Sequence, residues 1–289
     1  MMSSCLSAKE VRKFNFNVRA RSKSLRELNV KELIHLYVVL HCMTSECGSY
    51  LVSVHDMNKL IIPNLDASED IVHELIAQQI LNPYLEKNNL LRSDGYIVYD
   101  IAEIQTVPNI VEFQSAIKRG VEQPVTYLAE TIYDYLSHVS LSLQDKFLLK
   151  EMVTNLFFYE TVFSLDVLAD VQDVPYSFDT QKDTDLIDYM LLNKPMSACL
   201  GTIEHAIDFA FDVYTSDVFA PQFTDRTLMT KMEELVYTSA GDDIYFAGEL
   251  HYQCFMNETL MKLLMIDDLQ MDLSLRDIYD LIDNKNYLG

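Results

Sequence analysis

Glycine and proline are scarce in this sequence, which has seven of each among 289 residues. Both residues are common in the turns that link β-strands. Their scarcity therefore favours a mainly α fold over a turn-rich all-β fold. Hydrophobic residues make up 49% of the chain and charged residues 23%, which is typical of a globular protein with at least one substantial core.

The signatures of several common enzyme classes are also missing. The sequence has no GxxxxGK[ST] phosphate loop and no GxGxxG, GxSxG, HExxH or CxxC motif. Such motifs supply a backbone phosphate cradle, an activated nucleophile or a pair of metal ligands. The sequence therefore predicts no cofactor and favours a non-enzymatic protein.

Cysteine is sparse and odd in number, at positions 5, 42, 47, 199 and 254. Such a set in a chain of this length does not indicate a disulfide framework, so we expect reduced thiols. No run of about 18 uncharged apolar residues occurs, so we expect no membrane-spanning helix and no membrane partner. A cytoplasmic location follows as the simplest expectation.

Positive charge is scarce except at the start of the chain. Residues 1–31 hold eight of the 22 Lys and Arg residues and have a net charge of +6, whereas residues 32–159 have −10 and residues 160–289 have −18. The negative charge is therefore concentrated in the last 130 residues. A field of that sign repels nucleic acid and attracts basic partners.

The basic start of the chain combines cations with aromatic residues, a mixture that suits phosphate contact and base stacking. It also suits docking of the arm on an acidic domain, and we favour docking because nucleic-acid footprints are normally basic faces. The candidate arm residues are Arg12, Lys13, Phe14, Phe16, Arg19, Arg21 and Lys23.

Three helices and a hairpin are predicted after the arm. Asn29 and Glu32 have capping-box spacing before an apolar run, which predicts a helix over 30–42. Helices over 53–61 and 66–81 should follow, and Asp94-Gly95 between apolar runs indicates a β-hairpin. This order of elements resembles that of a winged-helix domain, which would bind nucleic acid.

The rest of the chain has an almost entirely helical pattern of apolar residues. Helices are expected over 124–139, 142–163, 184–193, 196–214, 224–238, 249–266 and 274–283, with a loop over 173–183. The overall prediction is a mainly α protein in three parts. These are a basic arm (1–28), a winged-helix-like α+β domain (29–112) and an acidic all-α domain (121–289).

A metal site has only weak local support. His41, Cys42, Cys47 and His55 are the best local zinc ligands, but four-residue spacing between cysteines is not diagnostic. Cys42 also ends an apolar helix, where a free cysteine usually packs as a small hydrophobic residue. We therefore expect no metal there. The segment 183–194 fails as a calcium loop because its turn position lacks Gly and its last position lacks Glu.

Two helices carry acidic residues at four-residue spacing. Glu204, Asp208 and Asp212 share a helix face beside His205, and like charges at that spacing repel one another. A basic partner, a metal ion or bulk water would relieve this repulsion. The second stripe consists of Glu130, Asp134 and His138.

The C-terminal helix is acidic opposite its apolar stripe. A solvated surface is one interpretation of this pattern. The other is an acidic contact surface that uses a tyrosine as its aromatic anchor. The residues concerned are Asp277, Tyr279, Asp280 and Asp283.

Three functions remain open at this point. The leading hypothesis is a regulatory protein that binds a basic protein through its acidic helices, either inhibiting it, as an immunity protein does, or recruiting it. The first alternative is a nucleic-acid-binding regulator that uses the arm. The second is a metal-dependent enzyme whose carboxylates and histidines come from the two acidic stripes.

Overall fold

Helices dominate the computed structural model, which describes residues 13–17, 20–57, 59–84, 96–100, 105–216, 222–238, 254–266 and 272–288. Ten α-helices and two small two-stranded sheets lie within these residues. The chain divides into two compact units. The first consists of Met1–Ile61 and Leu65–Leu136, and the second of Ile62–Asn64 and Ser137–Gly289.

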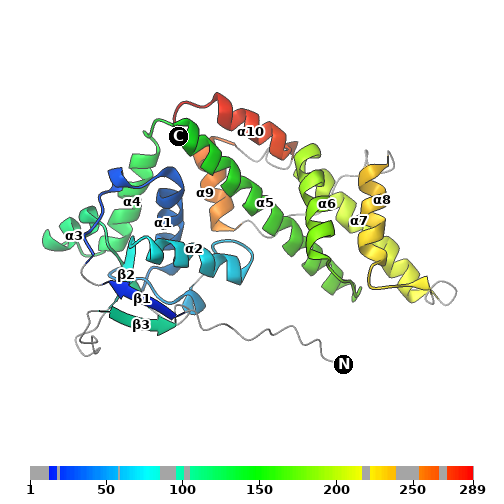
Figure 1. The fold of residues 1–289 in the computed structure, drawn as a ribbon, viewed down its shortest axis with the longest axis horizontal. Coiled ribbons are helices and arrows are strands. Elements are labelled where there is room, and N and C mark those ends of the chain that lie inside the picture. The colour runs from blue at the N-terminus through cyan, green and yellow to red at the C-terminus, as the bar shows by residue number, and fades with distance from the viewer. Residues whose placement is uncertain are drawn as a thin grey trace. The chain divides into compact units, whose positions relative to one another are not determined.

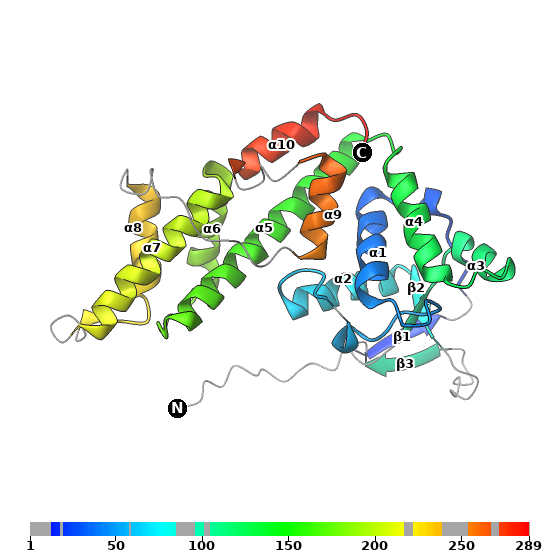
Figure 2. The same ribbon diagram turned by 180° about the vertical axis from the view of Figure 1, so that it is seen from behind.

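The central helix of the first unit is α1 (Val30–Met43), as the capping box predicts. The Asn29 side chain accepts from the Glu32 N–H at 2.9 Å, and the Glu32 carboxylate accepts from the Asn29 N–H at 2.8 Å. Most of α1 is buried. Figure 2 shows it between α2 (Leu65–Ala77) and α4 (Pro124–Leu136), both of which pack against it.

The predicted boundary at 113–120 lies inside the first unit, which continues to Leu136. Sequence analysis missed α3 (Val111–Lys118), which packs on α4. In α4, Leu128 and Ile132 are fully buried. Because α4 also packs on α1, both α3 and α4 belong to the first unit.

Two predicted helices of the first unit are shorter than expected. In place of a helix over 53–61 there is a single 3-10 turn at Val54–Asp56, closed by the Ser53 hydroxyl, which donates to the Asp56 carboxylate at 2.7 Å. The helix predicted over 66–81 is α2, which ends at Ala77. Gln79 adopts a left-handed φ of 61° there, and the Ile80 N–H donates to the Leu75 carbonyl at 2.9 Å. This is the geometry of a Schellman motif.

Strands complete the first unit. Strand β2 (Leu81–Pro83) pairs antiparallel with β4 (Thr106–Pro108). Strand β1 (Lys13–Asn17) pairs antiparallel with β3 (Tyr96–Asp100), with Asn15 opposite Val98. The turn predicted at Asp94-Gly95 lies outside the described residues. Part of the basic arm is therefore a strand of the first unit.

The longest helix of the second unit is α5 (Leu143–Val171), which continues two turns beyond its predicted end. Ser142 and Asp145 form a capping box at its start. Helix α5 packs against α6 (Thr180–Asn193), α7 (Met196–Thr215), α9 (Phe255–Leu264) and α10 (Leu275–Asn284), several of which are visible around it in Figure 1.

Helix α5 is also the one helix of the described residues that is long and apolar enough to cross a membrane. Four helices of its own unit pack against it, and Val153 and Leu156 are fully buried. One face of the helix thus packs into the core of the second unit.

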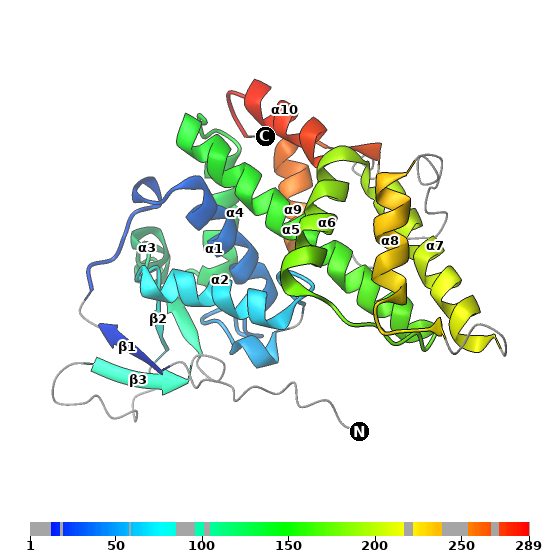
Figure 3. The ribbon, with the colours of Figure 1, turned by 45° about the vertical axis from the view of Figure 1, so that its right-hand side comes forward.

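Three helices lie together away from the start of α5. Helix α8 (Thr227–Tyr237) packs on α6 and α7, as Figure 3 shows. The loop predicted over 173–183 is shorter, because Asp179 caps α6 and its helix begins at Thr180. The predicted helix over 249–266 is described as α9 from Phe255, and residues 249–253 lie outside the described part.

Candidate functional site

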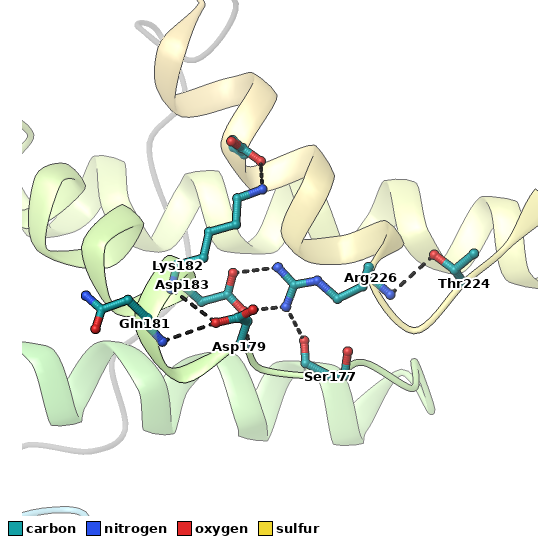
Figure 4. Close-up of polar contacts among 8 residues, drawn as sticks. Ser177, Asp179, Gln181, Lys182, Asp183, Thr224 and Arg226 are labelled. Carbon is teal, nitrogen blue, oxygen red and sulfur yellow. Dashed lines mark hydrogen bonds and ion pairs between the residues drawn. The ribbon is translucent and has the colours of Figure 1, made fainter.

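A buried ion pair fixes the start of α8 against the start of α6 (Figure 4). Asp183 is 1% exposed, and Arg226 donates to both of its carboxylate oxygens, from Nη1 at 2.5 Å and Nη2 at 2.6 Å. Nη1 also donates to the Ser177 carbonyl at 2.8 Å, and the Asp179 N–H donates to Asp183 at 2.6 Å. The Asp183 hydrogen bond raises the pKa of Arg226. This pair holds α6 and α8 in register.

Further along the same helices lie two exposed tyrosines. Tyr189 of α6 is 46% exposed and Tyr237 of α8 is 58% exposed, and their ring centroids are 5.1 Å apart. Asp185 and Asp188 lie four residues and one residue before Tyr189, and both are exposed. Glu234 lies three residues before Tyr237 and is also exposed. These five residues are called the tyrosine face below.

Negative charge on the tyrosine face is only partly compensated. Lys231 lies 3.0 Å from Glu234, and the Gln181 amide donates to Asp185 at 3.0 Å. Burial raises the pKa of Asp188, and the like charge of Asp185 raises it further. The face therefore favours the approach of a cation.

Helix α7 carries the predicted stripe of Glu204, Asp208 and Asp212. Asp208 and Asp212 are exposed and Glu204 is half-buried. The Gln172 side chain donates to Asp208 at 2.8 Å. Aromatic side chains that are also exposed on this helix are Phe209, Phe211 and Tyr214.

The acidic residues of α10 have more intramolecular roles than the sequence predicts. Asp277 belongs to a capping box, in which Ser274 donates to it from its N–H at 2.9 Å and from its hydroxyl at 2.6 Å. The hydroxyl bond is the larger cause that lowers the pKa of Asp277. Asp283 pairs with Lys150 of α5 at 2.7 Å.

Tyr279 is half-buried instead of forming an exposed anchor. Its hydroxyl forms a hydrogen bond with Thr154, and the Lys150 ammonium lies 5.4 Å from its ring centroid. Among the four predicted residues of α10, Asp280 is exposed and none of the contacts above involves it. Helix α10 is therefore largely engaged with α5.

Replacing Asp277 with alanine is expected to lower the free energy of unfolding by about 1 kcal/mol, because it removes the capping partner of Ser274. Replacing Asp280 with alanine removes the same charge from the same helix without affecting the cap. That control should change stability by less than about 0.5 kcal/mol. Urea unfolding of both variants tests the prediction, and equal losses would contradict it.

A polar cluster lies between α5 and α9. The Asn257 side-chain amide donates to both carboxylate oxygens of Glu160 at 2.8 Å, and the Cys254 sulfur lies 3.6 Å away from one of them. Burial raises the pKa of Glu160 to about 7 and also raises the pKa of the Cys254 thiol. Asn257 is 4% exposed, and its Oδ1 has no hydrogen-bond partner among the described residues.

The metal ligands considered from sequence do not form a site. Cys42 is buried, whereas His41, Cys47 and His55 are exposed. Nowhere in the described part of the chain do three His, Cys, Asp or Glu side chains form a group that could hold a metal ion. Glu130, Asp134 and His138 are all exposed.

The described part of the basic arm is bound to the first unit. Arg21 pairs with Glu27, and Lys23 exchanges backbone hydrogen bonds with Asn109 and Val111 at 3.1 and 2.9 Å. Backbone hydrogen bonding from Ser24 is the main cause that lowers the pKa of Glu27. Of the predicted arm residues, Lys13, Phe14 and Phe16 lie in β1, whereas Arg12 and Arg19 lie outside the described residues.

No protein-family model matches the sequence, and neither a curated protein nor a solved structure matches it. Of the arrangements above, the ion pair, the tyrosine pair and the Glu160 cluster were missed by sequence analysis, because each joins residues that are far apart in the sequence.

Proposed function

We propose that this chain is a non-enzymatic interaction protein that binds a basic protein through the acidic helices of its second unit. Binding would either inhibit the partner or recruit it. The observation that carries the proposal is the presence of exposed aromatic side chains among exposed carboxylates on α6, α7 and α8. Aromatic residues supply contact area in protein interfaces, and complementary charge directs the encounter.

The charge distribution supports the same proposal. Residues 160–289 have a net charge of −18. Attraction between exposed charges decays over about 8–10 Å at ordinary ionic strength. A complex formed by such a surface should therefore weaken strongly as salt is added.

Affinity capture from a cell lysate tests the proposal. Proteins retained at low salt should have basic isoelectric points and should be released at about 0.5 M salt, where the Debye length is well below 8 Å. Neutralising Glu204, Asp208 and Asp212 with their amides should reduce retention. The matched control neutralises three exposed carboxylates of the first unit, Asp66, Glu122 and Glu130. Neutral or acidic partners retained unchanged in high salt would contradict the proposal.

We infer a second candidate function, nucleic-acid binding by the first unit. Its support is the pairing of β1 with β3, which makes part of the basic arm a strand of that unit. The first unit also contains α1, α2 and short strands, but in place of the second of the three helices predicted for a winged-helix order it has a single 3-10 turn at Val54–Asp56. The first unit, arm included, has 13 Lys and Arg against 17 Asp and Glu, and this net charge of −4 counts against the candidate.

A further inference from the structure

We propose that the tyrosine face binds an arginine-bearing segment of the basic partner, an inference that rests on the proposed function and locates its binding site. The guanidinium would stack on the rings of Tyr189 and Tyr237. The carboxylates of Asp185 and Asp188 would accept its hydrogen bonds. The second unit already holds two of its own cations in a comparable way.

Two cations of the second unit pack on aromatic rings beside a carboxylate. Lys231 lies 4.8 Å from the Phe209 ring centroid and 3.0 Å from Glu234. Lys150 lies in the same way, 5.4 Å from the Tyr279 ring centroid and 2.7 Å from Asp283. An ammonium group held by a ring and a carboxylate is thus a recurring arrangement here.

The tyrosine face has the aromatic rings and the carboxylates of that arrangement, but not the cation. Its rings are tilted by 45° to each other with centroids 5.1 Å apart. Two of its three carboxylates, Asp185 and Asp188, lie on the turn that precedes Tyr189, and the third, Glu234, pairs with Lys231. Among the residues that the structure describes, no lysine or arginine lies over either ring of this pair. The basic partner would supply the cation.

Arginine suits this surface better than lysine. A guanidinium is planar, so it can stack on a tyrosine ring while its edge donates to carboxylates. It is also more weakly hydrated than an ammonium group, which lowers the cost of transferring it to the ring. Tyrosine and arginine are both enriched among the residues that dominate binding energy in interfaces.

Charge complementarity identifies the occupant. The face lies in the part of the chain with a net charge of −18, so a second copy of this chain would be repelled. Exposed apolar side chains mark interaction sites when they are grouped in a patch with polar residues around it, and not when they are scattered singly. A basic segment satisfies both the charge and the exposed rings.

A titration with a synthetic peptide tests the inference. The probe is an alanine-based helical peptide with arginine at positions i and i+4, and its control has citrulline, a neutral isostere, in their place. Fluorescence anisotropy at low salt should show binding of the arginine peptide and at least about tenfold weaker binding of the citrulline peptide. A lysine peptide should bind with intermediate affinity.

Protein variants separate the rings from the charges. The double variant Tyr189→Ala/Tyr237→Ala should lose about tenfold in affinity without any change in net charge. Tyr189→Phe/Tyr237→Phe should retain binding, because the rings are kept. The matched control is Tyr287→Ala, which removes an equally exposed tyrosine at 58% from the same unit. Because all three tyrosines are exposed, circular dichroism should show that each variant is folded.

The outcomes distinguish the two proposals. The arginine peptide could bind in a salt-sensitive way while the Tyr189/Tyr237 and Tyr287 alanine variants bind it equally well. In that case the acidic surface binds the peptide, but the tyrosine face is not the site. If the unmodified protein binds neither the peptide nor a basic protein at low salt, the proposed function itself fails.

Discussion

Replacing Arg226 with methionine is expected to destabilise the second unit by about 3–5 kcal/mol. The substitution leaves the Asp183 carboxylate, which is 1% exposed, without the two hydrogen bonds that Arg226 donates. A buried charge that loses its partner keeps its desolvation penalty. The Asp179 N–H at 2.6 Å remains, but one neutral donor cannot replace a bidentate guanidinium.

The chain offers a matched control for this prediction. Lys182 of α6 pairs with Glu233 of α8 at 2.6 Å, and these side chains are 57% and 37% exposed. Exposed ion pairs contribute about 0–1 kcal/mol, so Lys182→Met should have a small effect. The double variant Arg226→Met/Asp183→Asn should recover part of the loss, because it removes the buried charge as well. Equal effects of Arg226→Met and Lys182→Met in urea unfolding would contradict the interpretation.

The Glu160 cluster is expected to make the stability of the second unit fall as pH rises. Burial raises the pKa of Glu160 from 4.5 to about 7. The folded state therefore holds a proton that the unfolded state releases between about pH 4.5 and pH 7. Linkage requires the free energy of unfolding to decrease over that window and to level off above it. A shift of this size corresponds to about 3 kcal/mol.

Glu160→Gln removes the titrating group and keeps the shape of the side chain. The free energy of unfolding should be similar for the variant and the unmodified protein near pH 5, and higher for the variant by about 2–3 kcal/mol near pH 8. Because the other acidic residues titrate in both proteins, the difference between the two isolates Glu160. A difference that does not change with pH would contradict the account.

Local sequence patterns predicted the helices because helix starts are encoded by short-range contacts. Asn29 with Glu32 was identified by spacing, and the pair forms a capping box. Ser142 with Asp145 and Ser274 with Asp277 form capping boxes at the starts of two other predicted helices. The end of α5 was placed too early, since the helix continues to Val171. The first residue after α5 with a left-handed backbone conformation is Asp173, whose φ is 52°.

Contacts between distant residues could not be predicted in this way. The Lys13–Asn17 segment has the composition of a basic arm, and only pairing with Tyr96–Asp100 makes it a strand. The sequence pattern around Asp183 was compared with a calcium loop, which it fails to match. The ion pair of Asp183 could not be predicted, because its partner Arg226 lies 43 residues later.

The same limitation applies to the candidate site. Amphipathic spacing indicates that Tyr189 and Tyr237 are on helix surfaces, but it does not indicate that α6 and α8 are neighbours. It also does not reveal that α5 engages Tyr279 and Asp283 of α10. The acidity of the second unit was evident from sequence, whereas the position of its exposed rings required the fold.

Hydrogen exchange of the full chain tests most directly whether the acidic second unit is the surface that this protein presents to other molecules. The exchange is measured with the arginine peptide and, separately, with a duplex oligonucleotide. The account predicts that the peptide slows amide exchange within Thr180–Asn193 and Thr227–Tyr237, and that the duplex leaves exchange unchanged. Protection of Lys13–Asn17 by the duplex, together with no protection by the peptide, would contradict it.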